Sequence, residues 1–366
     1  MILRIEETCG DNFIKNINIS IAAAGTGGHI NPGIAVAESL QKKGYTILWL
    51  GTPKGMENRL VDKKKYKFSP LSISGFRKKG FFRKICMPFM LTISIFQAIK
   101  ALQLSKTKIL IVMGGYVSFP AALAAKILNV RLIVHEQNSI PGFTNKILSH
   151  ISNYNFSAFT NNIKNARVVG NPIRNEIRKV TNPKKRFLNR RGPLRILVFG
   201  GSLGANFFNH NLPSILEKIN KKNKLSVIHQ SGENMFDFLV QNYKEKNIKA
   251  EVKKYIFDMD KKYDWADIVI ARSGALTVSE LIQSGTASIL IPFPPAVDDH
   301  QYFNAKILEE KDATYIIRQS DLNKKLPIYL AKLDRKKCKK MAINAKSLHK
   351  LDPCKEIFKL CESLIK

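Results

Sequence analysis

Short apolar runs rich in β-forming residues alternate with helical patterns along the whole of this 366-residue chain. The intervening segments, such as 34–44 and 275–285, have helical apolar spacing and end in glycine, which commonly stops a helix. This alternation predicts an α/β fold built on parallel sheets. We expect strands at residues 17–23, 45–50, 108–113, 131–136, 194–200, 225–230, 250–256, 267–271 and 287–292.

Two doubly wound, Rossmann-like domains in series are the expected organisation, because the chain is too long for one ordinary domain. Each half begins with a strand that runs into a glycine-rich turn, at 25–28 and at 200–204. A basic, proline-containing stretch between the halves is typical of a linker. We expect an N-terminal domain at 1–180 with an extension at 1–16, a linker at 181–193, a C-terminal domain at 194–345, and a helical segment at 346–366 that packs back on the N-terminal domain.

The formal net charge of +32 is the extreme feature of the composition. A surplus of this size attracts phosphates in nucleic acid, at an anionic membrane surface or in a phosphorylated substrate. The alternative is that the lysines of a compositionally biased chain are simply solvated. The hydrophobic fraction of 45% can supply real cores, so wholesale disorder is not expected.

Cysteine usage and hydropathy bear on the cellular compartment. The five cysteines are scattered and form no CxxC pair, which predicts neither a disulfide framework nor a zinc site and fits a reducing compartment. The N-terminus has early acids and no sustained apolar core, which argues against a signal peptide. The best candidate for a membrane span, 85–99, contains Pro88 and is shorter than the roughly 20 residues that a span needs. A soluble or peripheral protein is therefore expected.

The first glycine-rich turn leads directly into His29 and a helical pattern. Glycines let the backbone approach an oxyanion, and a helix N-terminus offers unpaired N–H donors. A dinucleotide site is disfavoured, because Ile30 replaces the last glycine of GxGxxG and no acid follows the second strand. The structural alternative is a tight strand-to-helix connection. His29 lies where a ligand should lie and its imidazole suits a general base, although a lone histidine is more often structural.

Polar residues also follow two other strands of the first half, namely Tyr116 after one and Glu136 with Asn138 at the end of the next. Ligands bind beyond the carboxyl ends of parallel strands, so these side chains are expected to face the same crevice as His29. Ordinary loop chemistry explains each of them when it is taken alone.

The second half repeats this arrangement. Ser202 lies in the second glycine-rich turn, where its hydroxyl can bond a phosphate, and Ser273 with Gly274 opens another helix. Two such turns without a Walker lysine favour a diphosphate held by backbone groups and dipoles over ATP hydrolysis.

Further polar residues in the second half are Glu280, His300 with Gln301, and Asp258 with Asp260. Glu280, inside the helix that Ser273 opens, can hold ribose hydroxyls or be solvated, and His300 with Gln301 precedes a further helix. Asp258 and Asp260 match a DxD metal site, although acids just before a helix are more often caps.

The segment 75–96 mixes basic residues, phenylalanines and a long apolar run. A buried helix flanked by surface lysines would explain it without a function. Alternatively, its apolar part inserts shallowly into a membrane while the basic residues pair with anionic headgroups, each worth about 1 kcal/mol near the surface. The residues of this docking surface would be Arg77, Lys78, Lys79, Phe81, Phe82, Arg83 and Lys84.

Seven motifs, from about residue 18 to near the C-terminus, resemble those of the bacterial MurG family in order and spacing. These enzymes are the UDP-N-acetylglucosamine–lipid I N-acetylglucosaminyltransferases of glycosyltransferase family 28. One such motif can arise by chance, but seven in register are specific. They are GTGGHINPGIAVA, MGGYVSFPAALAA, HEQNSIPGFTNK, VVGNPIR, GGSLGA, WADIVIARSGALTVSE and DDHQYFNA.

The resemblance implies the GT-B fold, in which two Rossmann-like domains face a cleft. The acceptor lipid would bind in the first domain and the UDP-sugar mainly in the second. The implied reaction is inverting transfer of N-acetylglucosamine from UDP to the 4-hydroxyl of undecaprenyl-pyrophosphoryl-MurNAc-pentapeptide (lipid I), giving lipid II in peptidoglycan synthesis. Such a displacement needs a base, for which His29 is the first choice and Glu136 the second. Neither a cofactor nor a metal is implied.

The same resemblance implies a set of site residues. Tyr116 would act in catalysis beside His29 and Glu136, while Asn209 and His300, which is Gln in some members, would support the site. The extension at 1–16 and the unusually basic linker depart from the family pattern. The implied donor contacts are Thr26, Gly27, Gly28, Asn138, Arg174, Ser202, the Ile256 backbone, Ala275, Leu276, Thr277, Val278, Ser279, Glu280 and Gln301.

The implied partners are UDP-N-acetylglucosamine, lipid I, an anionic inner-membrane surface, and other cell-wall synthesis or division proteins. The implied location is peripheral, at the cytoplasmic face of the bacterial inner membrane. One alternative is another GT-B enzyme acting on UDP-sugars, such as a lipid glycosyltransferase or a 2-epimerase. The other is a basic nucleic-acid-binding protein, but the sequence has no recognised module or aromatic-interleaved basic face, so no nucleic-acid partner is expected.

Overall fold

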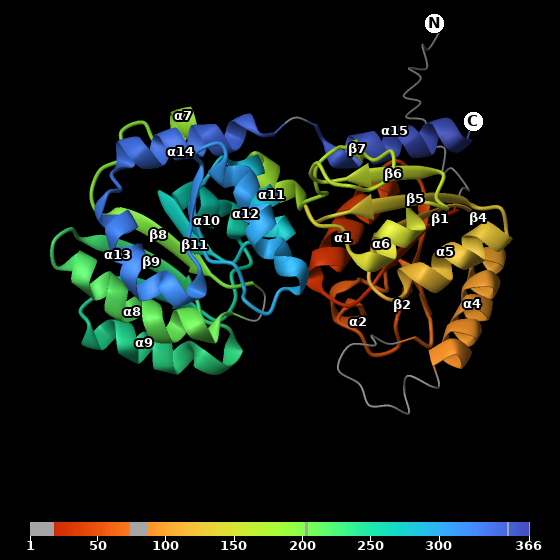
Figure 1. The fold of residues 1–366 in the computed structure, drawn as a ribbon, viewed down its shortest axis with the longest axis horizontal. Coiled ribbons are helices and arrows are strands. Elements are labelled where there is room, and N and C mark those ends of the chain that lie inside the picture. Colours follow the sequence, from red (N-terminus) through yellow and green to blue (C-terminus); the bar gives the residue numbers. More distant parts are fainter. Residues whose placement is uncertain (1–17, 74–86, 202–203, 350, 366) are drawn as a thin grey trace, which may run out of the picture. The chain divides into compact units, whose positions relative to one another are not determined.

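The computed structural model describes residues 18–73, 87–201, 204–349 and 351–365, which form an α/β fold with two parallel sheets (Figure 1). The strands are β1 (Asn18–Ala23), β2 (Thr46–Gly51), β3 (Lys67–Pro70), β4 (Thr107–Gly114), β5 (Arg131–Glu136), β6 (Tyr154–Ser157), β7 (Arg167–Val168), β8 (Leu194–Phe199), β9 (Leu225–Gln230), β10 (Ala250–Lys253), β11 (Ile268–Ala271), β12 (Ala287–Leu290) and β13 (Thr314–Ile316).

The helices alternate with these strands. The α-helices are α1 (Gly27–Gln41), α2 (Glu57–Leu60), α4 (Met87–Leu104), α5 (Ser118–Ile127), α6 (Phe143–Leu148), α7 (Pro183–Arg186), α8 (Asn206–Asn220), α9 (Phe236–Glu245), α10 (Met259–Trp265), α11 (Ala275–Ser284), α12 (His300–Glu309), α13 (Leu322–Ala331), α14 (Arg335–Ser347) and α15 (Pro353–Ile365). Short 3-10 helices are η1 (Asn175–Lys179), η2 (Glu233–Met235), η3 (Val297–Asp299) and η4 (Gln319–Asp321).

Both sheets are doubly wound, as the sequence predicts. Their strand orders are β3-β2-β1-β4-β5-β6-β7 and β10-β9-β8-β11-β12-β13, with parallel pairing of β1 to both neighbours and of β8 to both neighbours. In each sheet the strand order reverses beside the first strand, between β1 and β4 and between β8 and β11. Such a switch point is where an open α/β sheet leaves room for a ligand beyond its strand ends.

The second sheet is buried on both faces. Ile196 and Val198 of β8 belong to a core with α8, α9, α13 and α14, whereas Leu197 and Phe199 belong to a core with α10, α11 and α12. Because successive residues of a strand point to opposite faces, this division requires the continuous apolar run of β8. The nine strands predicted from the sequence are all present, and their ends lie within three residues of the expected positions.

Contact density divides the chain into two compact units. Unit 1 takes in the described residues up to Val134, His150–Tyr154 and the chain from Cys354, and unit 2 takes in His135–Ser149 and Asn155–Pro353. Within unit 1, α15 packs on α1 and on Tyr45, the residue directly before β2. The Cys354 Sγ lies 3.7 Å from the Ala35 carbonyl, and the Phe358 ring meets Tyr45 edge-on at 6.2 Å between centroids.

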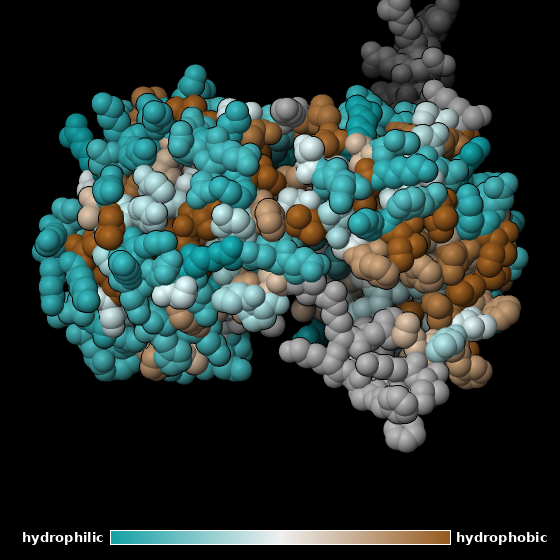
Figure 2. Space-filling model, viewed as in Figure 1, coloured by the Kyte–Doolittle hydropathy of each residue, from teal (hydrophilic) through white to brown (hydrophobic). Residues whose placement is uncertain are grey.

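Helix α4 presents an apolar face to solvent. Ser94, Ala98 and Leu102 are buried, whereas Phe89 and Phe96 are 70% and 66% exposed, and apolar side chains gather over α4 and α5 (Figure 2). From the sequence, the apolar run 85–99 is too short to span a membrane. In the structure the helix extends beyond this run, to Leu104. Among the described residues, α4 is long and apolar enough to cross a membrane by length and composition alone.

Candidate active site

The glycine-rich turn after β1 packs against the turn after β4. Gly25 has φ +97°, and a Cβ there would lie 3.5 Å from the Tyr116 ring; Gly115 has φ +82°, and a Cβ there would lie 2.2 Å from the Ala24 carbonyl oxygen. At Gly115 only glycine allows both the positive φ and the close approach, whereas at Gly25 the positive φ alone favours glycine. Thr26 begins α1 without a side-chain capping bond, and no acid lies in the first turn. The N-terminus of α1 thus retains the donors and partial positive charge that suit an anion.

A buried carboxylate that the sequence did not single out fixes this turn. Glu57 Oε1 accepts hydrogen bonds from the Thr52 amide (2.7 Å) and the Thr52 hydroxyl (2.6 Å), and Oε2 accepts one from the Gly25 amide (3.4 Å). Burial, and after it the proximity of Glu57, raises the pKa of Tyr116 above its ordinary value. Tyr116 is therefore a neutral hydroxyl at physiological pH.

His29 lies in the first turn of α1, where its ring is held by β4. Its Nδ1 is 3.0 Å from the Met113 carbonyl oxygen. Since a carbonyl oxygen can only accept, Nδ1 carries the proton in this bond and the lone pair of the neutral ring is on Nε2. In that tautomer Nε2 is the ring nitrogen that can take a proton as a general base.

In unit 2, the Glu136 carboxylate at the end of β5 organises the loop that follows it. Oε1 accepts from the Asn138 amide (2.8 Å) and side chain (3.2 Å), and Oε2 accepts from the Gly142 amide (3.1 Å) and Asn145 Nδ2 (2.9 Å). Both oxygens thus accept two N–H donors each, and the side chain is buried. The Glu136 carboxylate therefore holds the loop 138–145 in place through four hydrogen bonds, an arrangement that we call a loop clamp.

Asn304 of α12, another residue that the sequence reasoning did not single out, joins this loop to the start of α11. Its Oδ1 accepts from the Ser139 amide (2.9 Å) and hydroxyl (2.8 Å), and its Nδ2 donates to Asn138 Oδ1 (3.3 Å) and the Ser273 carbonyl (3.4 Å). Asn171 similarly bonds the Gln137 carbonyl and the Ser279 hydroxyl. These buried amides bring Asn138 and the N-terminus of α11 together.

Arg174 and Glu280, both expected at the donor, contact each other. Arg174 Nη2 is 3.1 Å from Glu280 Oε1, and the Tyr263 hydroxyl donates to Oε2 at 3.0 Å. Burial, with Glu280 as the second cause, raises the pKa of Tyr263 well above its ordinary value. Glu280 is thus held in one orientation, with Arg174 partly exposed beside it.

The other expected α11 residues divide by exposure. Ala275, Val278 and Ser279 are buried, and Leu276 and Thr277 are partly exposed. Gly274 begins the helix without a side-chain cap. As in α1, the first-turn N–H groups can meet an anion.

The turn after β8 is tied to Ile256 by Gln230, which is buried. Gln230 Nε2 donates to the Gly201 carbonyl (2.7 Å) and its Oε1 accepts from the Ile256 amide (2.9 Å). Asn209 is fully buried and donates to the carbonyl of Ser231 (2.8 Å), the residue that directly follows β9. Ser202, expected at the phosphates, lies outside the described residues.

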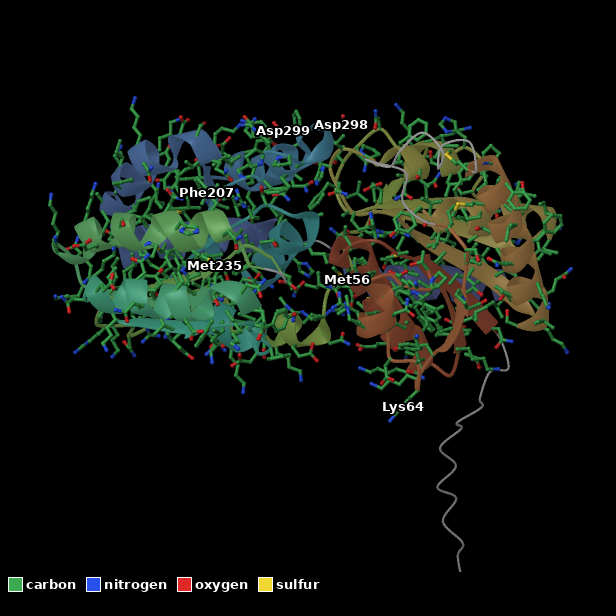
Figure 3. The ribbon with its side chains drawn as sticks, turned by 90° about the horizontal axis from the view of Figure 1, so that it is seen from below. Met56, Lys64, Phe207, Met235, Asp298 and Asp299 are labelled. Atoms are coloured by element: carbon green, nitrogen blue, oxygen red, sulfur yellow. The ribbon has the colours of Figure 1, made fainter. Side chains whose placement is uncertain are left out.

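Two consecutive aspartates with positive φ turn the chain into α12, Asp298 (φ 51°) and Asp299 (φ 52°), which lie side by side in Figure 3. Arg318 grips the Asp299 carboxylate with both terminal nitrogens, at 2.9 and 2.7 Å. His300 and Gln301 follow in the first turn of α12, and Gln301 Oε1 accepts from the Phe293 amide at 2.9 Å.

The DxD pattern does not gather further ligands among the residues that the structure describes. No group of three His, Cys, Asp or Glu side chains there could hold a metal ion. Asp258 begins α10 and lies 3.8 Å from Lys262. The basic and aromatic residues expected to dock a membrane, Arg77 to Lys84, lie outside the described residues.

Comparison with known proteins matches both halves of the chain. Residues 19–156 match the glycosyltransferase family 28 N-terminal domain, and residues 195–359 match the family 28 C-terminal domain. A relative from Dechloromonas aromatica is 38% identical over 95% of this chain and 99% of its own length, and one from Azoarcus sp. is 41% identical over 94% and 97%. Each is a "UDP-N-acetylglucosamine--N-acetylmuramyl-(pentapeptide) pyrophosphoryl-undecaprenol N-acetylglucosamine transferase".

Solved structures agree with the fold. The chain is similar to the Acinetobacter baumannii MurG crystal structure, with a TM-score of 0.84 and 34% identity over 95% of this chain and 99% of the other. A UDP-GlcNAc 2-epimerase from Neisseria meningitidis shares the fold at 13% identity, with a TM-score of 0.62 over 95% and 99% of the two chains. The expected two-sheet GT-B architecture is confirmed, and the chain belongs to glycosyltransferase family 28.

Proposed function

We propose that this enzyme transfers N-acetylglucosamine from UDP-N-acetylglucosamine to N-acetylmuramyl-(pentapeptide) pyrophosphoryl-undecaprenol, with inversion at the sugar carbon. The observation that carries the proposal is the near full-length identity of 38–41% to transferases named for this reaction. The uncapped N-terminus of α11 in unit 2 supports it, because its first-turn N–H groups can stabilise a departing diphosphate without a metal.

The direct test is a transfer assay with radiolabelled UDP-N-acetylglucosamine and a short-chain analogue of the lipid acceptor. We expect one labelled disaccharide product and release of UDP. UDP-glucose and UDP-N-acetylgalactosamine serve as controls and should transfer poorly. Conversion of the UDP-sugar to an epimer in the absence of acceptor would instead favour an epimerase and overturn the proposal.

His29 is the proposed base for the acceptor hydroxyl. Its Nδ1–H bond to the Met113 carbonyl supports this role, because it orients the ring and leaves the lone pair on Nε2. Glu136, the second candidate for the base, is better suited to holding the Asn138 loop, because each of its oxygens already accepts two N–H bonds and one of these would have to break before it could take a proton. Tyr116, held neutral beside the first turn, is the proposed hydrogen-bond donor to the acceptor.

The donor is proposed to bind mainly to the region 194–345, and the acceptor to 1–180. The proposed donor contacts in unit 2 are the N-terminal turn of α11, Glu280 on the ribose with Arg174 at the diphosphate, the Ile256 backbone at the uracil, and Gln301 on the sugar. Asn138 and Ser202 complete this set, while Asn209 and His300 support it. Thr26, Gly27 and Gly28 are proposed to meet the donor from their turn in unit 1. The tight Arg174–Glu280 contact supports a common ligand for the two side chains.

We also infer peripheral binding to the cytoplasmic face of an anionic membrane, where the lipid acceptor resides. The exposed Phe89, Phe96 and Leu104 of α4 support this, since apolar side chains of a helix that packs by one face can insert shallowly. The basic segment at 77–84 precedes this helix in the sequence and supplies cations for headgroups.

Vesicle flotation tests the membrane inference. The double variant Phe89→Ser/Phe96→Ser should lose most binding to phosphatidylglycerol-containing vesicles. The control variant Phe238→Ser, at an exposed position of α9, should still bind the same vesicles. Equal flotation of the two variants would remove α4 from the membrane contact.

A further inference from the structure

The chain enters α12 through two consecutive residues in the left-handed region, Asp298 (φ 51°, ψ 26°) and Asp299 (φ 52°, ψ 27°), which are labelled in Figure 3. In the part of the chain that the structure describes, no other two neighbouring non-glycine residues both have positive φ. Aspartate enters this region more readily than most residues, but such backbone still costs free energy and persists only where surrounding groups hold it. The entry to α12 therefore needs a group that keeps it in this conformation.

Arg318, which follows β13 and precedes η4, is placed to be that group. Its Nη1 and Nη2 bond the two carboxylate oxygens of Asp299, at 2.9 and 2.7 Å. Its guanidinium carbon lies 4.0 Å from the centroid of the Tyr302 ring, in the first turn of α12. Exposed ion pairs generally contribute little to stability, but a bidentate arginine–carboxylate pair fixes the orientation of both side chains. Arg318 thus holds the entry to α12 at two points.

Gln301 lies between these two points in the chain. Its Oε1 accepts a hydrogen bond from the Phe293 amide at 2.9 Å. The Phe293 carbonyl accepts from the Ala296 amide (3.0 Å), and the Ala296 carbonyl accepts from the Asp299 amide (3.2 Å). These bonds form a series from Gln301 through the loop to Asp299 and its partner Arg318. Because each member of the series supports the next, releasing the Asp299 carboxylate alters the support of Gln301.

We propose that Arg318 is a positioning residue, which keeps Gln301 in the orientation that meets the N-acetylglucosamine of the donor. It acts through Asp299 and Tyr302 and makes no contact with the donor itself. This inference rests on the proposed function, in which Gln301 contacts the sugar and the UDP half is bound by other elements. Loss of the Arg318–Asp299 pair therefore weakens binding of the sugar half and spares that of UDP.

Isothermal titration of the full chain with UDP and with UDP-N-acetylglucosamine, in the absence of acceptor, separates the two halves of the donor. In Arg318→Gln the affinity for UDP-N-acetylglucosamine should fall about fivefold, as for the loss of one hydrogen bond, while that for UDP stays within about twofold of the parent. The matched control is Lys325→Gln, because Lys325 and Asp321 form a 2.7 Å ion pair whose side chains are 45% and 38% exposed, against 45% and 37% for Arg318 and Asp299. The control should change neither affinity.

A double-mutant cycle tests whether Arg318 acts through Asp299. Asp299→Asn removes the carboxylate but keeps a residue that accepts the left-handed backbone. If the pair acts as a unit, Asp299→Asn, Arg318→Gln and the double variant should each lose about fivefold in affinity for UDP-N-acetylglucosamine. Losses that multiply in the double variant would show two independent effects and overturn the proposal.

Gln301→Ala distinguishes a failure of this inference from a failure of the proposed function. It should reproduce the selective loss of affinity for UDP-N-acetylglucosamine. If Gln301→Ala shows this loss and Arg318→Gln does not, the positioning role is refuted and the proposed sugar contact stands. If neither variant distinguishes UDP-N-acetylglucosamine from UDP, the proposed sugar contact of Gln301 fails as well. Equal weakening of both ligands in Arg318→Gln would show a purely structural role and would also overturn the proposal.

Discussion

Replacing Glu136 by glutamine distinguishes a loop clamp from a catalytic base. In the structure each carboxylate oxygen accepts two N–H donors, from the loop residues Asn138, Gly142 and Asn145. Glutamine keeps one oxygen and presents an NH2 group where the other was, so either orientation of the amide leaves two of these N–H donors without their acceptor. Because Asn138 is half-buried and Gly142 is exposed, water satisfies part of this loss, and the expected loss of unfolding free energy is about 1–3 kcal/mol.

Urea unfolding of the full chain, followed by circular dichroism, measures this loss. Glu176→Gln is the matched control, because Glu176 is exposed on η1, and it should change the unfolding free energy by no more than about 0.5 kcal/mol. The pH dependence of kcat in the surviving Glu136→Gln protein should keep the shape of the parent profile. A variant as stable as the parent, with kcat reduced more than about a hundredfold, would show that the carboxylate takes the proton and would refute the clamp.

Three further outcomes are expected. Gly115→Ala should lower the free energy of unfolding in urea by more than about 3 kcal/mol, because its Cβ would lie 2.2 Å from the Ala24 oxygen. The control Gly192→Ala, at φ +83° with open space around it, measures the backbone cost alone, about 1–2 kcal/mol. Equal losses in the two variants would contradict the clash. Burial lowers the pKa of His135 to about 4, so the unfolded chain binds a proton at higher pH than the folded chain does. The free energy of unfolding should therefore fall by about 3 kcal/mol as the pH drops from about 6.5 to about 4. His135→Gln should flatten this part of the plot of unfolding free energy against pH, and an unchanged slope would contradict the prediction. Glu280→Gln should raise the KM for UDP-N-acetylglucosamine about tenfold or more through loss of a charge-assisted contact, whereas Glu217→Gln, a partly exposed ion-pair partner on α8, should leave it unchanged.

The long central strands could be predicted from the sequence, whereas of the short outer strands only β10 could. Continuous apolar runs such as that of β8 are required by burial on two faces. By contrast, β3 has the sequence KFSP and β7 is two residues long, so neither carries enough apolar signal. These strands exist because a neighbouring strand offers unpaired backbone groups, which is a property of the sheet and has no trace in local sequence.

The residues of the candidate site likewise divide into those that could be predicted from the sequence and those that could not. Residues directly after strands, such as His29 and Glu136, could be found because parallel topology brings strand ends together. Glu57, Gln230 and Asn304 could not, because their positions in helices or strands carry no pattern and their roles arise only when folding buries them beside distant backbone groups. A buried amide that satisfies another loop becomes recognisable only in three dimensions.

The return of α15 to unit 1 has a consequence for synthesis on the ribosome. The cysteine thiol of Cys354 and the Ala35 carbonyl that it contacts are 319 residues apart in the chain. At about 5–20 residues per second, the nascent unit 1 waits about 15–60 s for the helix that covers this part of α1. Meanwhile the surface of unit 1 that α15 will cover stays open, and transiently exposed apolar surface of this kind favours association with other chains until the helix emerges.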